Sequence, residues 1–121
     1  MEANTDTTYD FPTHIQGSTF KGVSFQILVN DVPLDLTGAT IEMVVDTYYS
    51  PVSNVLTLST ELENEKIVIT DAENGRFSVI PQIIDVAAAL YKYDIKITTA
   101  DSTVRKPISG KWHIVSSASY E

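Results

Sequence analysis

The sequence has no cysteine at all, and it has no long apolar run. Without cysteine the chain can form no disulfide, and it offers neither a catalytic thiol nor a thiolate ligand for a metal. A transmembrane helix needs roughly 18 consecutive apolar residues, and no such run is present. The polar, acidic start also lacks the basic and apolar regions of a secretory signal. We therefore expect a chain that is made in a cytoplasm, folds by packing alone and has no membrane partner.

Basic residues are scarce as well, because eight lysines and arginines stand against sixteen acidic residues, for a formal net charge of −8. A nucleic-acid backbone repels such a surface, so we expect no nucleic-acid partner. The charge is also uneven: residues 1–65 contain one basic residue, Lys21, whereas residues 66–121 contain seven. This asymmetry would suit subunits that stack head to tail, although a soluble acidic surface is the simpler interpretation.

β-Branched residues are abundant, since valine, isoleucine and threonine supply 38 of the 121 residues. Such side chains pack well on a pleated surface and favour strands. Apolar and polar residues alternate over 23–29, 41–47 and 91–98, which is the period of a strand with one buried face. Further strands are predicted at 13–16, 55–58, 66–70, 76–80 and 103–115. We predict an all-β fold, an immunoglobulin-like antiparallel β-sandwich of about 7–8 strands.

Two local signals refine this prediction. Asn74-Gly75 is a strong turn dipeptide, because both residues tolerate positive φ, and it predicts a hairpin between 66–70 and 76–80. The segment 82–90 is the one helix candidate, because three consecutive alanines and Asp85 suit a short turn of helix.

Tyr91 lies at the start of a late strand, where immunoglobulin-like domains place a tyrosine corner. If it serves that purpose, the strands around Ile41 and Tyr91 should be neighbours in one sheet. Lys92 and Lys96 would then face the acids of the strand 41–47, Glu42 and Asp46, on the outer side of the sheet.

The chain divides into an extended amino-terminal arm at 1–12, a β-sandwich domain at 13–115 and a carboxy-terminal tail at 116–121. Residues 1–10 contain a single aromatic side chain, Tyr9, and cannot build a core of their own. Polar ends fray unless something holds them, so we expect the arm and the tail to order on neighbouring chains.

The residues that carry chemistry are few and scattered. His14 lies in the amino-terminal region, and His113 follows an inward Trp112, so both are expected at the surface and far from any catalytic partner. Asp71, Glu73 and Asn74 resemble a calcium loop only in part, and a hairpin turn explains them better. The glutamates within 61–65 are interpreted as solvated, and the glycines form no phosphate loop. We predict no enzyme, no cofactor and no metal site.

Aromatic side chains in loops and near the ends mark a candidate protein interface, because they bury a large area at low entropy cost. Packing under the loops of the same chain is an equally good interpretation. The candidate interface residues are Tyr9, Phe11, His14, Tyr48, Tyr49 and Tyr120.

Several segments resemble a known family when they are taken together. They are Gly17-Ser18-Thr19-Phe20, Val32-Pro33-Leu34-Asp35-Leu36-Thr37-Gly38-Ala39-Thr40-Ile41, Asn74-Gly75-Arg76-Phe77, Leu90-Tyr91-Lys92-Tyr93-Asp94-Ile95 and Gly110-Lys111-Trp112-His113-Ile114. In this order they resemble the small β-sandwich domains of tailed-phage virion proteins, notably the amino-terminal domain of baseplate upper proteins. Similar domains anchor tail fibres. The resemblance spans about residues 13–115.

The resemblance implies a structural virion component: a baseplate, tail, collar or head-fibre adaptor or decoration subunit. In the family such a domain usually precedes a longer fibre, whereas this chain ends at Glu121, so we expect a stand-alone subunit. It would assemble with other virion proteins, as a homo-oligomer within a larger assembly, and be located in the virion after synthesis in the host cytoplasm. The alternative is a module that binds carbohydrate or a host receptor through Tyr48, Tyr49 and nearby loops. An enzyme, the third hypothesis, would require a turnover that His14→Ala abolishes.

Overall fold

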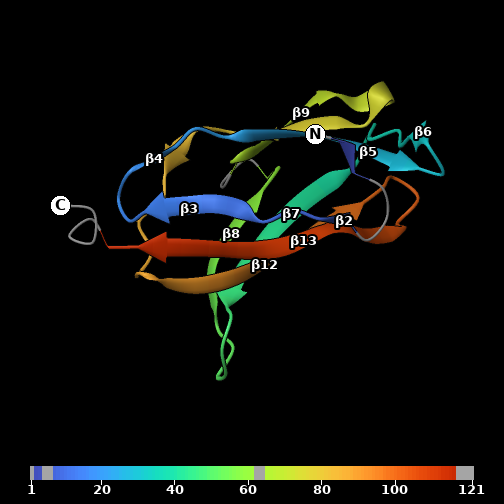
Figure 1. Ribbon diagram of the computed structural model, residues 1–121. Helices are drawn as coiled ribbons and strands as arrows, with labels where there is room; N and C mark the ends of the chain where they lie inside the picture. Colours follow the sequence, from blue (N-terminus) through green and yellow to red (C-terminus); the bar gives the residue numbers. More distant parts are fainter. Residues whose placement is uncertain (1, 4–6, 62–64, 117–121) are drawn as a thin grey trace.

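The computed structural model describes residues 2–3, 7–61 and 65–116 of the chain. Figure 1 shows an all-β fold, in which a single short 3-10 turn at Ala72–Asn74 interrupts the strands of the described residues. The strands are β1 (Glu2–Ala3), β2 (Thr7–Thr8), β3 (Phe11–Ile15), β4 (Thr19–Phe20), β5 (Val23–Val29), β6 (Val32–Pro33), β7 (Thr40–Thr47), β8 (Asn54–Ser59), β9 (Ile67–Asp71), β10 (Arg76–Val79), β11 (Gln82–Ile83), β12 (Ala89–Thr98) and β13 (Val104–Val115).

One sheet has the strand order β1-β5-β10-β9, with β6 added to the end of β5. The predicted hairpin is confirmed, because β9 and β10 pair antiparallel around the 3-10 turn. Gly75 ends that turn at φ 70°, and a Cβ there would lie 2.7 Å from the carbonyl oxygen of Ile27. Glycine is therefore needed at this position both for its backbone conformation and for the close approach of β5.

The larger sheet has the order β2-β13-β12-β7-β8, and β3 also pairs with β13. The expected neighbours are confirmed, because β7 and β12 pair antiparallel with Lys92 opposite Asp46 and Lys96 opposite Glu42. The ammonium of Lys96 lies 3.8 Å from Oε1 of Glu42. Such an exposed pair contributes little to stability. It does show that the charged side chains of β7 and β12 lie on the outer face of the sheet.

Most of the amino-terminal segment belongs to this same sheet, whereas β1 pairs with β5 in the other one. Strands β2 and β3 run parallel to β13, at the far edge of the sheet from β8. We expected residues 1–12 to find their partners on a neighbouring chain, whereas the described residues 7–12 lie against β13 of their own chain. The reason is Phe11, whose ring fills a space in the core and is 6% exposed.

The helix predicted at 82–90 is wrong. Residues 82–83 form β11, which pairs with β4, and residues 84–88 have no regular structure. Ile84 is buried, and its carbonyl accepts a hydrogen bond from the backbone N–H of Gly17 at 2.8 Å. Burial of an isoleucine and pairing with a distant segment outweigh the weak helix propensity of three alanines, which have little apolar surface to bury.

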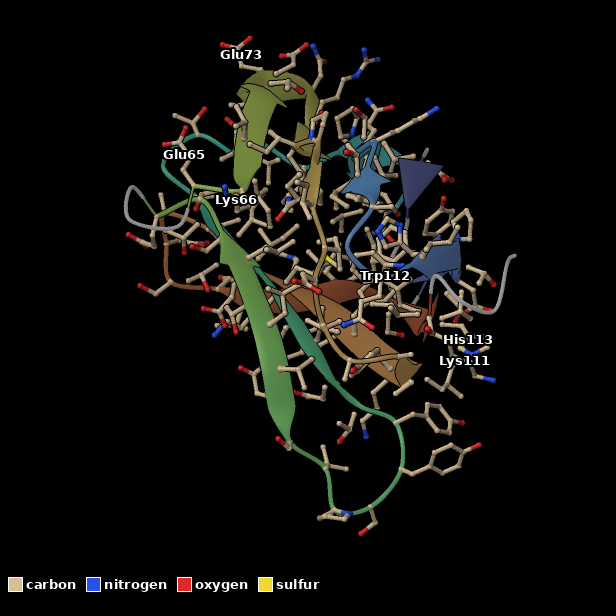
Figure 2. All side chains as sticks on the ribbon, turned by 90° about the vertical axis from the view of Figure 1, so that its left-hand side faces the viewer. Glu65, Lys66, Glu73, Lys111, Trp112 and His113 are labelled. Carbon is tan, nitrogen blue, oxygen red and sulfur yellow. The ribbon has the colours of Figure 1, made fainter. Side chains whose placement is uncertain are left out.

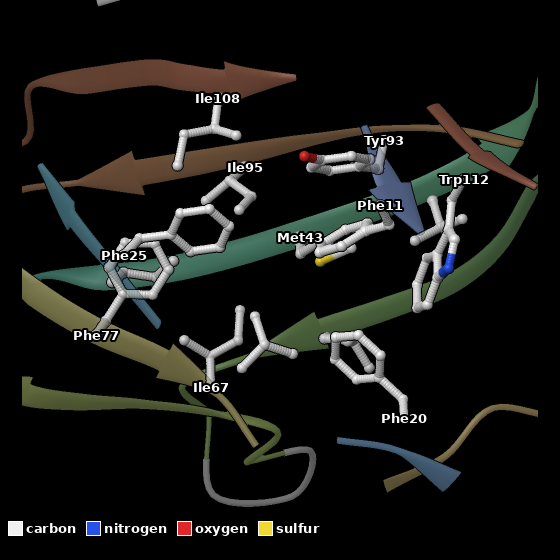
Figure 3. Packing of buried hydrophobic residues seen from close by; sticks show 14 of the residues in the cluster. Phe11, Phe20, Phe25, Met43, Ile67, Phe77, Tyr93, Ile95, Ile108 and Trp112 are labelled. Atoms are coloured by element: carbon white, nitrogen blue, oxygen red, sulfur yellow. The ribbon is translucent and has the colours of Figure 1, made fainter. Parts of the chain in front are cut away.

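The core is one cluster that joins residues of both larger sheets (Figure 3). Trp112, Phe25 and Phe77 are the largest of its fully buried side chains, and Trp112 and Ile114 point inward as predicted. The larger sheet curls into a half-barrel, and β4 and β11 form a separate two-stranded sheet. The all-β class is therefore confirmed, but the layers are more curved than those of a simple two-sheet sandwich.

Candidate functional site

A groove crosses the outer face of the larger sheet. Residues of β7, β12 and β13, most of them with outward side chains, line it together with Thr8, Asp10 and Tyr48. Its volume is about 550 Å³, within the usual range for pockets that bind small ligands. We call this feature the outer groove, and its lining residues are Thr8, Asp10, Asp46, Tyr48, Lys92, Tyr93, Asp94, Ser109, Gly110 and Lys111.

Charged residues form a row across the groove. Asp46, Lys92 and Lys111 lie side by side on three adjacent strands, because Lys92 is opposite Asp46 on one side and opposite Lys111 on the other. Two like charges directly opposite each other in a sheet are unfavourable. Within the described ranges, the ion pairs of the chain involve neither of these lysines. Their ammonium groups therefore keep their donors for a ligand or a partner.

One side of the groove is the chain between β2 and β3, and it is held close to β13. The backbone N–H of Tyr9 donates to the carbonyl of Ser109 at 2.9 Å, and that of Lys111 donates to Oδ1 of Asp10 at 2.9 Å. The approach is so close that a Cβ on Gly110 would lie 2.0 Å from the carbonyl oxygen of Tyr9. This side of the groove is thus fixed in place by backbone contacts.

Tyr93 lies beneath the same side of the groove. Its hydroxyl donates to the carbonyl oxygen of Tyr9, and its ring packs against Phe11 with the centroids 4.7 Å apart. Burial, helped by the neighbouring Tyr9 and Asp10, raises the pKa of the Tyr93 phenol far above its ordinary value. The group therefore stays protonated and remains a donor at any physiological pH.

Tyr48 closes the groove at its other end, where the loop between β7 and β8 begins. The ammonium of Lys111 lies over the Tyr48 ring, 5.5 Å from its centroid, and the Tyr49 ring meets that of Tyr48 edge to face at 5.0 Å. The backbone N–H of Tyr48 donates to the carbonyl of Leu90 at 3.1 Å. A cation over an aromatic ring is favourable, so Lys111 is held at this end of the groove.

Protein-family models and curated proteins give no match to this chain. In the part of the chain that the structure describes, no three histidine, aspartate or glutamate side chains gather as a metal site would require. Nor do the described residues include a helix with the length and apolarity of a membrane span.

The structure separates the candidate interface residues into two groups. Tyr48 and Tyr49 are exposed and adjacent, as an interface would require. Phe11 and His14 lie in the core of their own chain, and Tyr9 is half-buried with its ring edge against Phe25. Tyr120 lies outside the described residues. The aromatic candidates at the amino-terminal end are thus core residues in this chain, which is the alternative that the sequence left open.

The expectation that His14 lies at the surface is wrong. It is 9% exposed, with its ring near Phe20 and Trp112, and its Nε2 lies 3.0 Å from the carbonyl oxygen of Ser18. The cause is that β3 pairs with β13 and turns this side chain inward. His113 is exposed as predicted, and Figure 2 shows it beside Lys111 on the outside while Trp112 points inward.

Sequence reasoning missed the outer groove. The sequence did predict that Lys92 faces the acidic residues of β7, because both strands alternate clearly between apolar and polar residues, and this is one half of the charged row. The other half needs Lys111 opposite Lys92, and this follows from the register between β12 and β13. Counting pairs back from the turn at Asp101-Ser102 would place Lys92 opposite Gly110, because the register shifts by one residue between Ile95 and Ile97, so the sequence held no signal for this half.

Proposed function

We propose that this chain is a structural component of a tailed-phage virion that acts by protein–protein assembly with other virion proteins and with copies of itself. The virion setting is supported by the resemblance to baseplate and fibre-anchoring domains. The mode of action is supported by one feature of the surface, the loop at 48–53. We call it the projecting loop, because it extends beyond the body of the domain in Figure 1.

The projecting loop carries exposed apolar surface on a fixed frame. Tyr49 is 70% exposed and Val52 is 53% exposed, whereas isolated exposed hydrophobics elsewhere lie singly on short strands or strand ends. Thr47 closes the base of the loop, since its hydroxyl donates to the carbonyl of Pro51 and accepts from the N–H of Ser53. An exposed apolar patch that is already ordered loses little entropy when a partner covers it, which favours binding.

An immunoglobulin-like arrangement of the sheets is part of this proposal. The two strand orders are those of the A-B-E-D sheet and of a G-F-C sheet extended by one further strand at each edge, except that β1 runs parallel to β5. The hydroxyl of Tyr91 donates to the carbonyl of Ala87, four residues upstream, as in a tyrosine corner. Both features support a sandwich that has curled, and such domains present loops at their ends as contact surfaces.

The test is the double variant Tyr49→Ser with Val52→Ser. We expect it to fold normally and to be missing from particles purified from the phage that encodes it, because losing an aromatic anchor costs about 2 kcal/mol or more, roughly thirtyfold in affinity. The matched control is Val32→Ser with Val104→Ser, which removes two exposed valines elsewhere and should leave incorporation unchanged. Occupancy is measured by quantitative mass spectrometry of the particles.

Two results would contradict the proposal at different levels. Absence of the wild-type chain from purified particles would overturn the virion assignment. Normal occupancy of the Tyr49 and Val52 double variant would overturn the assembly role of the projecting loop, while leaving the virion assignment in place.

A further inference from the structure

We propose that the outer groove binds a neutral saccharide. This inference goes beyond the assembly role, since it concerns a small ligand and a groove that shares only Tyr48 with the projecting loop. It rests on the charges, the free hydrogen-bonding atoms and the aromatic end of the groove.

The charges that line the groove argue against an ionic ligand. Asp10, Asp46 and Asp94 supply three carboxylates, and Lys92 and Lys111 supply two ammonium groups. A phosphate or a uronate would face the carboxylates, and a cation would face the lysines. A hydroxyl group both donates and accepts, so a neutral polyol can satisfy the two kinds of group at once.

The carboxylates are oriented but retain free acceptors. Oδ1 of Asp46 accepts from the side-chain amide of Asn54 at 3.3 Å, and Oδ1 of Asp10 accepts from the backbone of Lys111. Within the described residues, the second oxygen of each of these two carboxylates has no hydrogen-bond donor, whereas Oδ2 of Asp94 lies 4.0 Å from the ammonium of Lys106. A carboxylate that is held by one oxygen presents its other oxygen in a fixed direction, so little entropy is lost when a ligand binds. A hydrogen bond from a sugar hydroxyl to this charged oxygen is stronger than one between two neutral groups.

The order of the charged groups along the row, two ammonium groups with a carboxylate at each end, also fits a sugar ring. Asp46, Lys92 and Lys111 follow one another across the strands, with Asp10 beyond them at the side of the groove. Neighbouring strands lie about 5 Å apart, so successive side chains in the row can reach successive hydroxyls of one ring. Tyr48 supplies an apolar wall at the end, on which the C–H face of a sugar can pack.

The experiment is a titration of the whole chain, followed by amide chemical shifts in two-dimensional NMR. The probes are methyl α-glucoside, methyl β-galactoside and N-acetylglucosamine, with glucuronate and inorganic phosphate as the ionic comparison. We expect at least one neutral sugar to shift the amide signals of Lys92, Ser109 and Lys111 saturably, with a dissociation constant of about 1–10 mM, as suits a shallow site for one ring.

Matched variants locate the site. Lys92→Met keeps the aliphatic stem and removes the donors, and we expect it to weaken sugar binding about tenfold or more. Lys96→Met is the control, because Lys96 is on the same outer face of β12 and lies outside the groove lining, so binding should be unchanged. The single variant Val52→Ser, which changes the projecting loop outside the groove lining, should bind sugar normally, and this separates the inference from the assembly proposal.

Three outcomes would overturn the inference. They are the absence of saturable shifts with every neutral sugar, tighter binding of glucuronate or phosphate than of any neutral sugar, and equal weakening by Lys92→Met and Lys96→Met. The first would remove the site, the second would make it an anion site, and the third would place the effect outside the groove. None of them would change the particle occupancy that tests the assembly role.

Discussion

Gly110→Ala is expected to lower the free energy of unfolding by about 3–5 kcal/mol, a large change for a single methyl group. The added Cβ would lie 2.0 Å from the carbonyl oxygen of Tyr9 and 2.7 Å from its carbonyl carbon. Both are backbone atoms, so no side-chain rotation relieves the clash. The cause is space, because Gly110 is not among the glycines with positive φ. The chain at residues 9–10 must therefore move away from β13.

The consequences of that movement extend into the core. The carbonyl of Tyr9 is the acceptor for the buried hydroxyl of Tyr93, and a buried hydroxyl without a partner costs about 1–3 kcal/mol. Phe11, two residues further along the chain, would be drawn out of its packed position. The amino-terminal segment thus couples to the core through the one residue of β13 that has no side chain.

Urea unfolding followed by the fluorescence of Trp112, the one tryptophan of the sequence, measures the effect. Gly17→Ala is the control, because Gly17 has φ 79° but its added Cβ would have no neighbour within 4 Å. We expect that variant to cost about 1–2 kcal/mol from backbone strain alone. A Gly110→Ala protein as stable as Gly17→Ala would contradict the close approach of residues 9–10 to β13.

The strands that the sequence predicted best are those with long, strict alternation. β5, β7 and β12 each bury one face against the core, and nearly every second residue along each strand is apolar. A period of two leaves only one register that buries every apolar side chain, so local sequence decides the outcome. The hairpin at Gly75 was equally predictable, because its turn chemistry is contained within a few adjacent residues.

The amino-terminal strand was not predictable in the same way. β3 pairs in parallel with β13, about a hundred residues further along the chain, and its sequence FPTHI has no clear alternation. Pro12 is compatible with an edge strand, since an edge leaves one side of the backbone unpaired. Only the three-dimensional fold shows that Phe11 and His14 are the inward positions of this strand.

The charged row of the outer groove depends on register across the turn at 99–103. Asp101 organises this turn, because its carboxylate accepts from the hydroxyl of Thr99 at 2.6 Å and from the backbone N–H of Thr103 at 3.1 Å. These hydrogen bonds lower the pKa of Asp101 to about 2. The pairing also shifts between Ile95 and Ile97, and such an irregularity moves the facing partner of every residue beyond it. Sequence alternation alone could not locate that shift.

Phe11→Ala is expected to destabilise the chain by about 3–5 kcal/mol, as truncation of a buried phenylalanine does. The ring contacts four aromatic neighbours, with centroids 4.7 Å from Tyr93, 4.8 Å from Trp112, 5.3 Å from Tyr9 and 5.7 Å from Phe20. Thr13→Ala, an exposed change on the same strand, is the control and should cost less than about 0.5 kcal/mol.

The same variant decides where the amino-terminal segment has its partners. If Phe11 packs in its own chain, the loss of stability upon Phe11→Ala is the same at low and high protein concentration. If the segment docks on a second copy instead, the wild-type stability rises with concentration by mass action, and the difference between the two proteins grows with it. A concentration-dependent difference would contradict the pairing of β3 with β13 within one chain. Because Phe11 is a core residue, a truncation of residues 1–12 would destabilise the domain itself. Its effect on assembly could then not be separated from its effect on folding, so variants of the projecting loop are the better test of assembly.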